Sequence, residues 1–251
     1  MLSGTNRKEK NMRNENLLSE IKSRGYWRVE MHSTAYQNDR LPKRGAMQDI
    51  LNSATVSLRG WPYPYFRTEE TAYDGKCLAG QINWRWGHKE DWRLHDSGQW
   101  IHYLGLPGAW VPREELFQGQ SPLPAQRPGY LHIRGDVLFT LTEILRFSVG
   151  LAQGGVLAPT AFLSIQLHNT HDYILYENVS RPWFLMHEFV NPLNTPIEQH
   201  RSVPVSQLSA VADQMALDMA IKVFEVFGWV PSGEGVRWLA EEQKKLIERR
   251  L

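Results

Sequence analysis

The chain has 251 residues, of which 42% are hydrophobic and 11% aromatic, so it can bury a sizeable core. Its formal net charge of +1 provides no global field that would attract nucleic acid or an anionic membrane, and its single cysteine, Cys77, excludes an intrachain disulfide framework and a cysteine-rich zinc site. The N-terminal residues lack the apolar run of a signal peptide, and no stretch approaches the roughly 18 apolar residues of a spanning helix. We therefore expect a cytoplasmic protein that does not enter a membrane.

Residues 1–14 are polar and include several basic side chains, which predicts a disordered basic tail ahead of a single folded domain over residues 15–251. Apolar residues at helical spacing then predict a helix over residues 17–21, and Gly25 is a residue that can end it. Alternating apolar and polar residues predict a strand over residues 27–31. The folded part of the chain is thus expected to begin with one helix and one strand.

Prolines punctuate the next region. Pro42 suits the first turn of a second predicted helix, because proline is well tolerated there. A short strand is expected at residues 56–59. Pro62 and Pro64 then interrupt regular pairing, since each removes a backbone donor and pushes the preceding residue towards extended geometry.

The segment from residue 78 to residue 106 holds four of the ten tryptophans and three of the nine histidines. Alternation at its start predicts a strand that buries Ile82, Trp84 and Trp86. The charged residues 88–91 predict a turn, and histidines and carboxylates near a strand connection are often functional. Extended character is expected to resume over residues 92–95 and 99–106.

The second half of the chain mixes helices and strands. Five prolines between residues 107 and 130 predict a loop or a linker, a point at which the domain can be subdivided. Helices are predicted over residues 134–152, 206–228 and 234–250, and strands over residues 163–167, 183–190 and 197–203. The helix residues expected in one core with Ile82, Trp84 and Trp86 are Val137, Leu141, Ile144, Leu208, Met215, Met219 and Val223. Because strands come in runs between helices, the pattern favours an α+β fold with a mostly antiparallel sheet packed against several helices.

Three short motifs carry a resemblance to a known family. The residues GYWRV at 25–29, LRGWPYP at 58–64 and WRLHDSGQWIH at 92–102 resemble the C-terminal module of bacterial proteins that carry a Schlafen-type AlbA DNA-binding domain ahead of it. The similarity covers about residues 15–150 and implies a bacterial accessory or sensing module. The family supplies no activity and no catalytic residues to transfer. Since no AlbA-like domain is recognisable ahead of this region, the resemblance implies no DNA binding.

Tryptophan and arginine are concentrated in loops that lack catalytic spacing. This pattern favours a non-enzymatic module that binds a partner protein or a small ligand and uses no cofactor, although catalysis stays open. The residues expected at the binding surface are Arg59, Trp61, Tyr63, Trp92, Gln99 and His102. We expect Trp61 and Trp92 to be partly exposed anchors.

Two other functions remain open from the sequence. A metal-dependent hydrolase or nuclease would draw its ligands from His88, Glu90, His95 and His102, but their spacing matches no recognised signature and is more typical of a solvated turn. A nucleic-acid-binding protein would use the basic tail and the aromatic and basic residues at 84–86, as single-strand platforms do. On a strand, however, Trp84 and Trp86 would point away from Arg85, which favours a place in the core.

Overall fold

A computed structural model of the chain describes residues 16–41, 44–67, 70–84, 87–118, 123–177 and 188–251. The expected basic tail, the expected start of a helix at Pro42 and the position of Trp86 lie outside these ranges. Among the described residues, no helix is long and apolar enough to cross a membrane.

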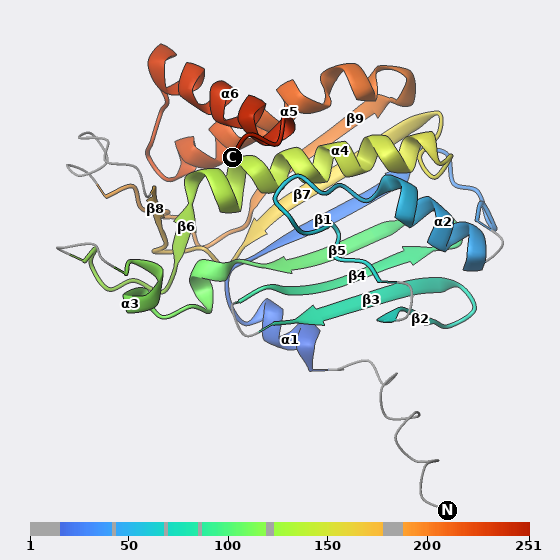
Figure 1. Cartoon of the computed structure of the whole chain (residues 1–251), viewed down its shortest axis with the longest axis horizontal. Coiled ribbons are helices and arrows are strands. Elements are labelled where there is room, and N and C mark those ends of the chain that lie inside the picture. Colours follow the sequence, from blue (N-terminus) through green and yellow to red (C-terminus); the bar gives the residue numbers. More distant parts are fainter. Residues whose placement is uncertain (1–15, 42–43, 68–69, 85–86, 119–122, 178–187) are drawn as a thin grey trace, which may run out of the picture.

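The centre of the fold is a seven-stranded antiparallel sheet with the strand order β2-β3-β4-β5-β1-β7-β9 (Figure 1). Its strands are β1 (Tyr26–Ser33), β2 (Ala72–Tyr73), β3 (Cys77–Asn83), β4 (Lys89–His95), β5 (Trp100–Gly105), β7 (Thr160–His168) and β9 (Ile197–Pro204). A small parallel pair, β6 (Tyr130–His132) and β8 (Ile174–Tyr176), lies at one end of the molecule. The α+β fold with a mostly antiparallel sheet is therefore confirmed.

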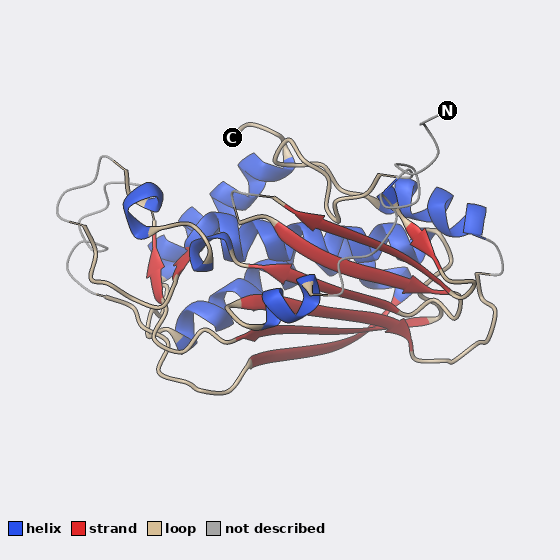
Figure 2. Cartoon of the chain, turned by 90° about the horizontal axis from the view of Figure 1, so that it is seen from below, coloured by secondary structure: helices blue, strands red, loops and turns tan. Residues whose placement is uncertain are grey.

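The longer helices gather on one face of this sheet. They are α2 (Arg44–Ala54), α4 (Thr140–Gln153), α5 (Val205–Val226) and α6 (Gly233–Ile247), and Figure 2 shows the helices behind the strands. The short helix α1 (Leu17–Lys22) lies against β4 and β5, where its buried Leu17 and Ile21 pack with Tyr26 apart from the main core. The connection after β5 holds two single turns, η3 (Pro107–Ala109) and α3 (Arg113–Leu116).

Strand register determines which side chains face the helices. Val29 of β1 lies between His102 of β5 and Ile165 of β7, and His102 in turn lies opposite Trp92 of β4. Because successive residues of a strand point to opposite faces, every second residue around these positions enters the core. That core is one continuous cluster from Trp27 to Leu246.

The predicted helix faces are confirmed. All seven helix residues expected to be buried, from Val137 in the helix predicted over residues 134–152 to Val223 in α5, lie in this core. Ile82 is buried as well. Trp84 is not: strand β3 ends at Asn83, and Trp84 is 42% exposed.

Two local predictions were wrong for reasons of backbone geometry. The charged residues 88–91 do not form the turn, because Lys89, Glu90 and Asp91 belong to β4. The reversal comes just before them, at Gly87, whose φ of +80° suits glycine and whose Cα faces the backbone of Pro107 at close range. The strand expected at residues 56–59 is reduced to a single bridge between Val56 and Tyr63.

The strand expected over residues 183–190 falls mostly outside the described ranges. Its last residue, Val190, forms only an isolated bridge with Ile174. The helix expected over residues 134–152 exists, but its first turns are a π-helix, η4 (Ile133–Phe139), which leads directly into α4. A π-helical segment in this place is a feature frequently associated with functional sites.

Candidate functional site

A small pocket of about 50 Å³ lies between the sheet and the junction of η4 with α4. Arg59, Trp61 and Tyr63 reach it from the link between α2 and β2, and His88 and Glu90 reach it from the start of β4. The prolines at positions 62 and 64 keep this link irregular, so that its side chains can turn inward one after another. The remaining lining residues are Trp27, Pro62, Leu104, Gly105, Leu106, Pro107, Asp136 and Thr140.

Glu90 is the central acid of the pocket and is almost completely buried. Its Oε1 lies 2.5 Å from His88 Nε2, and its Oε2 accepts a hydrogen bond from the backbone N–H of Tyr65 at 3.0 Å. His102 Nε2 lies 3.1 Å from the same Oε2, within ion-pair range but away from the hydrogen-bond direction. Burial alone would raise the pKa of Glu90, but its contacts with His102 and His88 outweigh burial and hold the pKa below its usual value.

The second ring nitrogen of His88, Nδ1, does not take part in the contact with Glu90. Since the ionised Glu90 can only accept, His88 Nε2 carries the hydrogen, which leaves Nδ1 as an acceptor in the neutral ring. Within the described ranges Nδ1 has no hydrogen-bond partner. Two tryptophans flank the ring, Trp61 at 6.1 Å and Trp84 at 5.4 Å between centroids, and both are about two-fifths exposed.

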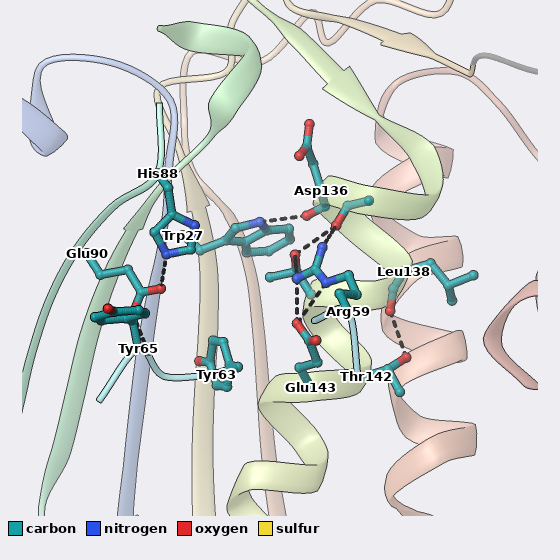
Figure 3. A network of polar contacts seen from close by, with 12 residues as sticks. Trp27, Arg59, Tyr63, Tyr65, His88, Glu90, Asp136, Leu138, Thr142 and Glu143 are labelled. Carbon is teal, nitrogen blue, oxygen red and sulfur yellow. Dashed lines mark hydrogen bonds and ion pairs between the residues drawn. The ribbon is translucent and has the colours of Figure 1, made fainter. Parts of the chain in front are cut away.

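Opposite His88 and Glu90, Arg59 connects the α2–β2 link to the junction of η4 with α4 (Figure 3). Its guanidinium forms an ion pair with Glu143 of α4 and donates to the carbonyl of Gly135 in η4 at 2.7 Å. Thr140 Oγ1 donates to the same carbonyl at 3.0 Å. Arg59 thus satisfies a carbonyl of the π-helix as well as a buried acid, which explains how the wider helical turn is held.

The Glu143 side chain is completely buried, yet only half of its carboxylate is paired. Oε2 accepts from Arg59, whereas Oε1 has no hydrogen-bond partner among the residues that the structure describes. Burial raises the pKa of Glu143, and Arg59 opposes the shift without cancelling it.

Asp136 and Tyr63 complete the polar wall. The backbone carbonyl of Asp136 accepts from Trp27 Nε1 at 3.0 Å, and its carboxylate accepts from the N–H of His132 at 2.8 Å; burial raises the pKa of this carboxyl group. The hydroxyl of Tyr63 lies 3.0 Å from His102 Nδ1. Burial, together with the nearby charge of Glu90, raises the pKa of Tyr63 well above its ordinary value, so its hydroxyl stays protonated.

The structure divides the binding surface expected from the sequence. Arg59, Trp61, Tyr63 and His102 come together, but Gln99 is an exposed residue in the β4–β5 turn. Trp92 is not an exposed anchor. Its side chain is 1% exposed, and it donates from Nε1 to the carbonyl of Tyr65 at 2.9 Å, because it shares the inward face of β4 with Glu90.

The proposed metal ligand set is divided as well. His88, Glu90 and His102 are neighbours, but His95 lies on the opposite face of β4, where its Nδ1 is 2.9 Å from Ser97 Oγ. Glu90 and His95 are five positions apart on β4, and an odd separation places two side chains on opposite faces because strand side chains alternate. Over the described ranges, no three His, Cys, Asp or Glu side chains are arranged to hold a metal ion.

Sequence reasoning missed three polar residues of the site and misplaced a fourth residue, Trp84. Glu143, Asp136 and Thr140 come from the region of the chain predicted as one helix. One signal was available for Glu143, since a charged residue within an otherwise apolar helix face is rarely buried without a partner. Trp84 was assigned to the core because the alternating pattern of β3 was extended one residue beyond its actual end.

Comparison of the chain with protein-family models, with curated proteins and with solved structures finds no match. The resemblance to the module that follows AlbA-type domains therefore stays a prediction from the sequence.

Proposed function

We propose that the protein binds a small planar ligand that carries an N–H or O–H group, at the mouth of the pocket formed by Trp61, Trp84 and His88. The observation that carries this proposal is the position of His88, whose ring is close to two partly exposed indoles and is backed by the buried Glu90. Large exposed aromatic side chains that converge on one polar group are typical of ligand sites.

Each part of this arrangement has a separate role in the proposal. The indoles of Trp61 and Trp84 offer flat apolar surfaces against which a ring can stack. Nδ1 of His88 accepts a hydrogen bond from the ligand, and the contact with Glu90 fixes the tautomer that makes this possible. The ligand has to be small, because the pocket behind the rim is about 50 Å³ and admits only a substituent.

Acid–base catalysis is the second candidate. It is favoured by the same 2.5 Å contact between His88 and Glu90, because a carboxylate that holds a histidine prepares it to accept a proton from a substrate. In that case the bound ligand would be converted, and His88 would act as the base. Binding is the common requirement of both candidates, so it is tested first.

The test uses free adenine, uracil and indole as planar probes, and cyclohexanol as a non-planar control, with binding followed by ligand-detected NMR. We expect at least one planar probe to bind with a Kd on the order of 1 mM or tighter and cyclohexanol to bind more weakly. His88→Asn and Trp61→Ala should each weaken that binding at least about tenfold, and the melting temperature of Trp61→Ala should change little because its side chain is 41% exposed.

A matched control is His200→Asn. His200 lies two residues from Glu198 on β9, as His88 lies two residues from Glu90, and the side chains of His200 and Glu198 are both exposed. Nε2 of His200 is 3.5 Å from Oε2 of Glu198. Equal loss of binding in both histidine variants, or no loss in either, would rule out the proposed site. Binding of oligonucleotides with a steep salt dependence, but of none of the free probes, would instead favour the nucleic-acid alternative.

A further inference from the structure

A second and larger pocket lies on the other side of η3 from the first. Pro107 of η3 lines the first pocket and Ala109 lines the second, so this single turn separates them. The second pocket has a volume of about 390 Å³, which falls within the range of small-molecule sites. Its walls come from the α1–β1 link, η3, the β7–β8 loop and residues 193–195.

The chemistry of these walls is one-sided. Arg24 and His171 are the ionisable groups with a basic side chain, and no Asp or Glu is among the described lining residues. The other polar side chains are hydroxyls and amides, which include Asn194 and Thr195. Asp172, the acidic residue next to His171 in the sequence, does not line the pocket, although its Oδ2 lies 3.4 Å from His171 Nε2. The lining therefore favours a negatively charged ligand.

Arg24 is held in place before any ligand arrives. Its Nη1 donates to the carbonyl of Ala109 at 2.5 Å, and its guanidinium lies over the ring of Trp110 with 4.4 Å to the centroid. Nε and Nη2 have no hydrogen-bond partner in the described part of the protein. A guanidinium fixed at one end, with donors remaining at the other, is suited to an oxyanion, which it can contact through two parallel hydrogen bonds.

The loops around the pocket are also fixed. Asn191 is completely buried, donates to Thr170 Oγ1 at 2.9 Å and accepts from the N–H of Leu193 at 3.0 Å. The amide of Asn169, a residue with φ of +55°, donates to the carbonyl of Lys22 at 2.8 Å. The turn after His168 is thus tied both to residues 191–193 and to the end of α1, which leaves a preformed cavity.

We propose that this second pocket is a binding site for a small molecule that carries a phosphate or carboxylate group, with Arg24 as the partner of the oxyanion. The hydroxyls and amides of Thr195 and Asn194 supply hydrogen bonds to the rest of the ligand. Trp110 supplies a signal for the test, because its ring lies against the guanidinium that would move or become neutralised.

The experiment titrates the full chain with inorganic phosphate and, separately, with malonate, at constant ionic strength set by chloride. The indole N–H resonance of Trp110, assigned with a Trp110→Phe variant, reports binding. We expect a saturable shift with a Kd on the order of 1–10 mM for at least one of the two anions. Whichever anion binds more tightly identifies whether phosphate or carboxylate is the recognised group.

Arg24→Gln should weaken binding at least about tenfold, and Arg24→Lys should recover only part of it, because the ammonium lacks the fork of donors. The matched control is Lys22→Gln, which removes a positive charge two residues before Arg24. The Lys22 side chain lies over the ring of Tyr103 and does not line the pocket. Equal weakening by Arg24→Gln and Lys22→Gln would reduce the effect to general surface charge and overturn the proposal, as would the absence of saturation. If Arg24→Gln fails to fold, Asn194→Ala replaces it, and undiminished binding by that variant would also contradict the site.

Discussion

Glu143 and Glu177 are both buried carboxylates that face an arginine, but their surroundings differ. Oε1 of Glu177 accepts from His132 Nε2 at 3.0 Å and from Arg134 Nη2 at 2.9 Å, and its Oε2 accepts from Arg134 Nε at 3.0 Å. In the Glu143 carboxylate, only Oε2 is paired with a residue of the described chain.

The acidities of the two groups follow this difference. Burial alone would raise the pKa of both carboxyl groups. At Glu177 the contacts with His132 and Arg134 outweigh burial and lower the pKa to about 2. At Glu143 burial outweighs Arg59, and the pKa is raised. A fully paired cluster is suited to stabilising the fold, whereas an under-paired acid near a pocket is typical of a place where another group is expected to bind.

The largest expected effect comes from removing the partner of the under-paired acid. Arg59→Met leaves Glu143 buried without a counter-charge, which should lower the free energy of unfolding by on the order of 3–5 kcal/mol at pH 7. The loss should diminish as the pH falls, because Glu143 can then bind a proton. Urea denaturation at several pH values measures both effects. Arg28→Met is the control: its pair with Glu30 is one-third exposed, so the change should be about 0–1 kcal/mol, and a comparable loss in both variants would contradict the assignment.

A somewhat smaller effect is expected at the fully paired acid. Because the pKa of Glu177 is lowered in the folded state, its contribution to stability is present above a pH of about 4.5 and is lost as the pH falls towards 2. Glu177→Gln should therefore cost about 2–3 kcal/mol at pH 7 and flatten the dependence of the urea midpoint on pH below 4.5. For Glu143→Gln we expect the opposite change of stability with pH. The pKa of Glu143 is raised in the folded state, so the stability that this carboxyl group contributes is present at low pH and is lost as the pH rises. If the urea midpoint falls equally steeply below pH 4.5 in the wild type and in Glu177→Gln, the surroundings of Glu177 and Glu143 do not differ in the way described.

The smallest effect is expected when both members of the under-paired pair are replaced. Arg59→Met combined with Glu143→Leu removes two buried charges at once, and its free energy of unfolding should stay within about 1 kcal/mol of the wild-type value, or exceed it. Urea denaturation of the double variant beside both single variants gives the coupling energy. A double variant as unstable as Arg59→Met alone would mean that Arg59 acts through the carbonyl of Gly135, and the contrast with Glu177 would then lose its basis.

Local patterns in the sequence were sufficient for the longer helices, for several strands and for the fold class. The stripe that includes Val137, Leu141 and Ile144 predicted a buried helix face, and the alternation around Val29 predicted a strand. These predictions succeeded because the 3.6-residue period of a helix and the two-residue period of a strand are properties of a few neighbouring residues. The π-helical start at η4 was not predictable in this way, since Arg59, distant in sequence, helps to hold it.

The composition of the pocket was decided by tertiary structure. The alternation of strand side chains could have separated His95 from Glu90, but only once the limits of β4 were known. The sequence pattern instead predicted a turn at the charged residues 88–91. The pairing of Arg59 with Glu143 joins residues 84 positions apart, and no local period contains that information. The sequence by itself thus determined which faces of the helices and strands are apolar. The register of the strands and the docking of α4 on the sheet determined which polar side chains meet, because contacts between distant residues depend on how whole elements pack.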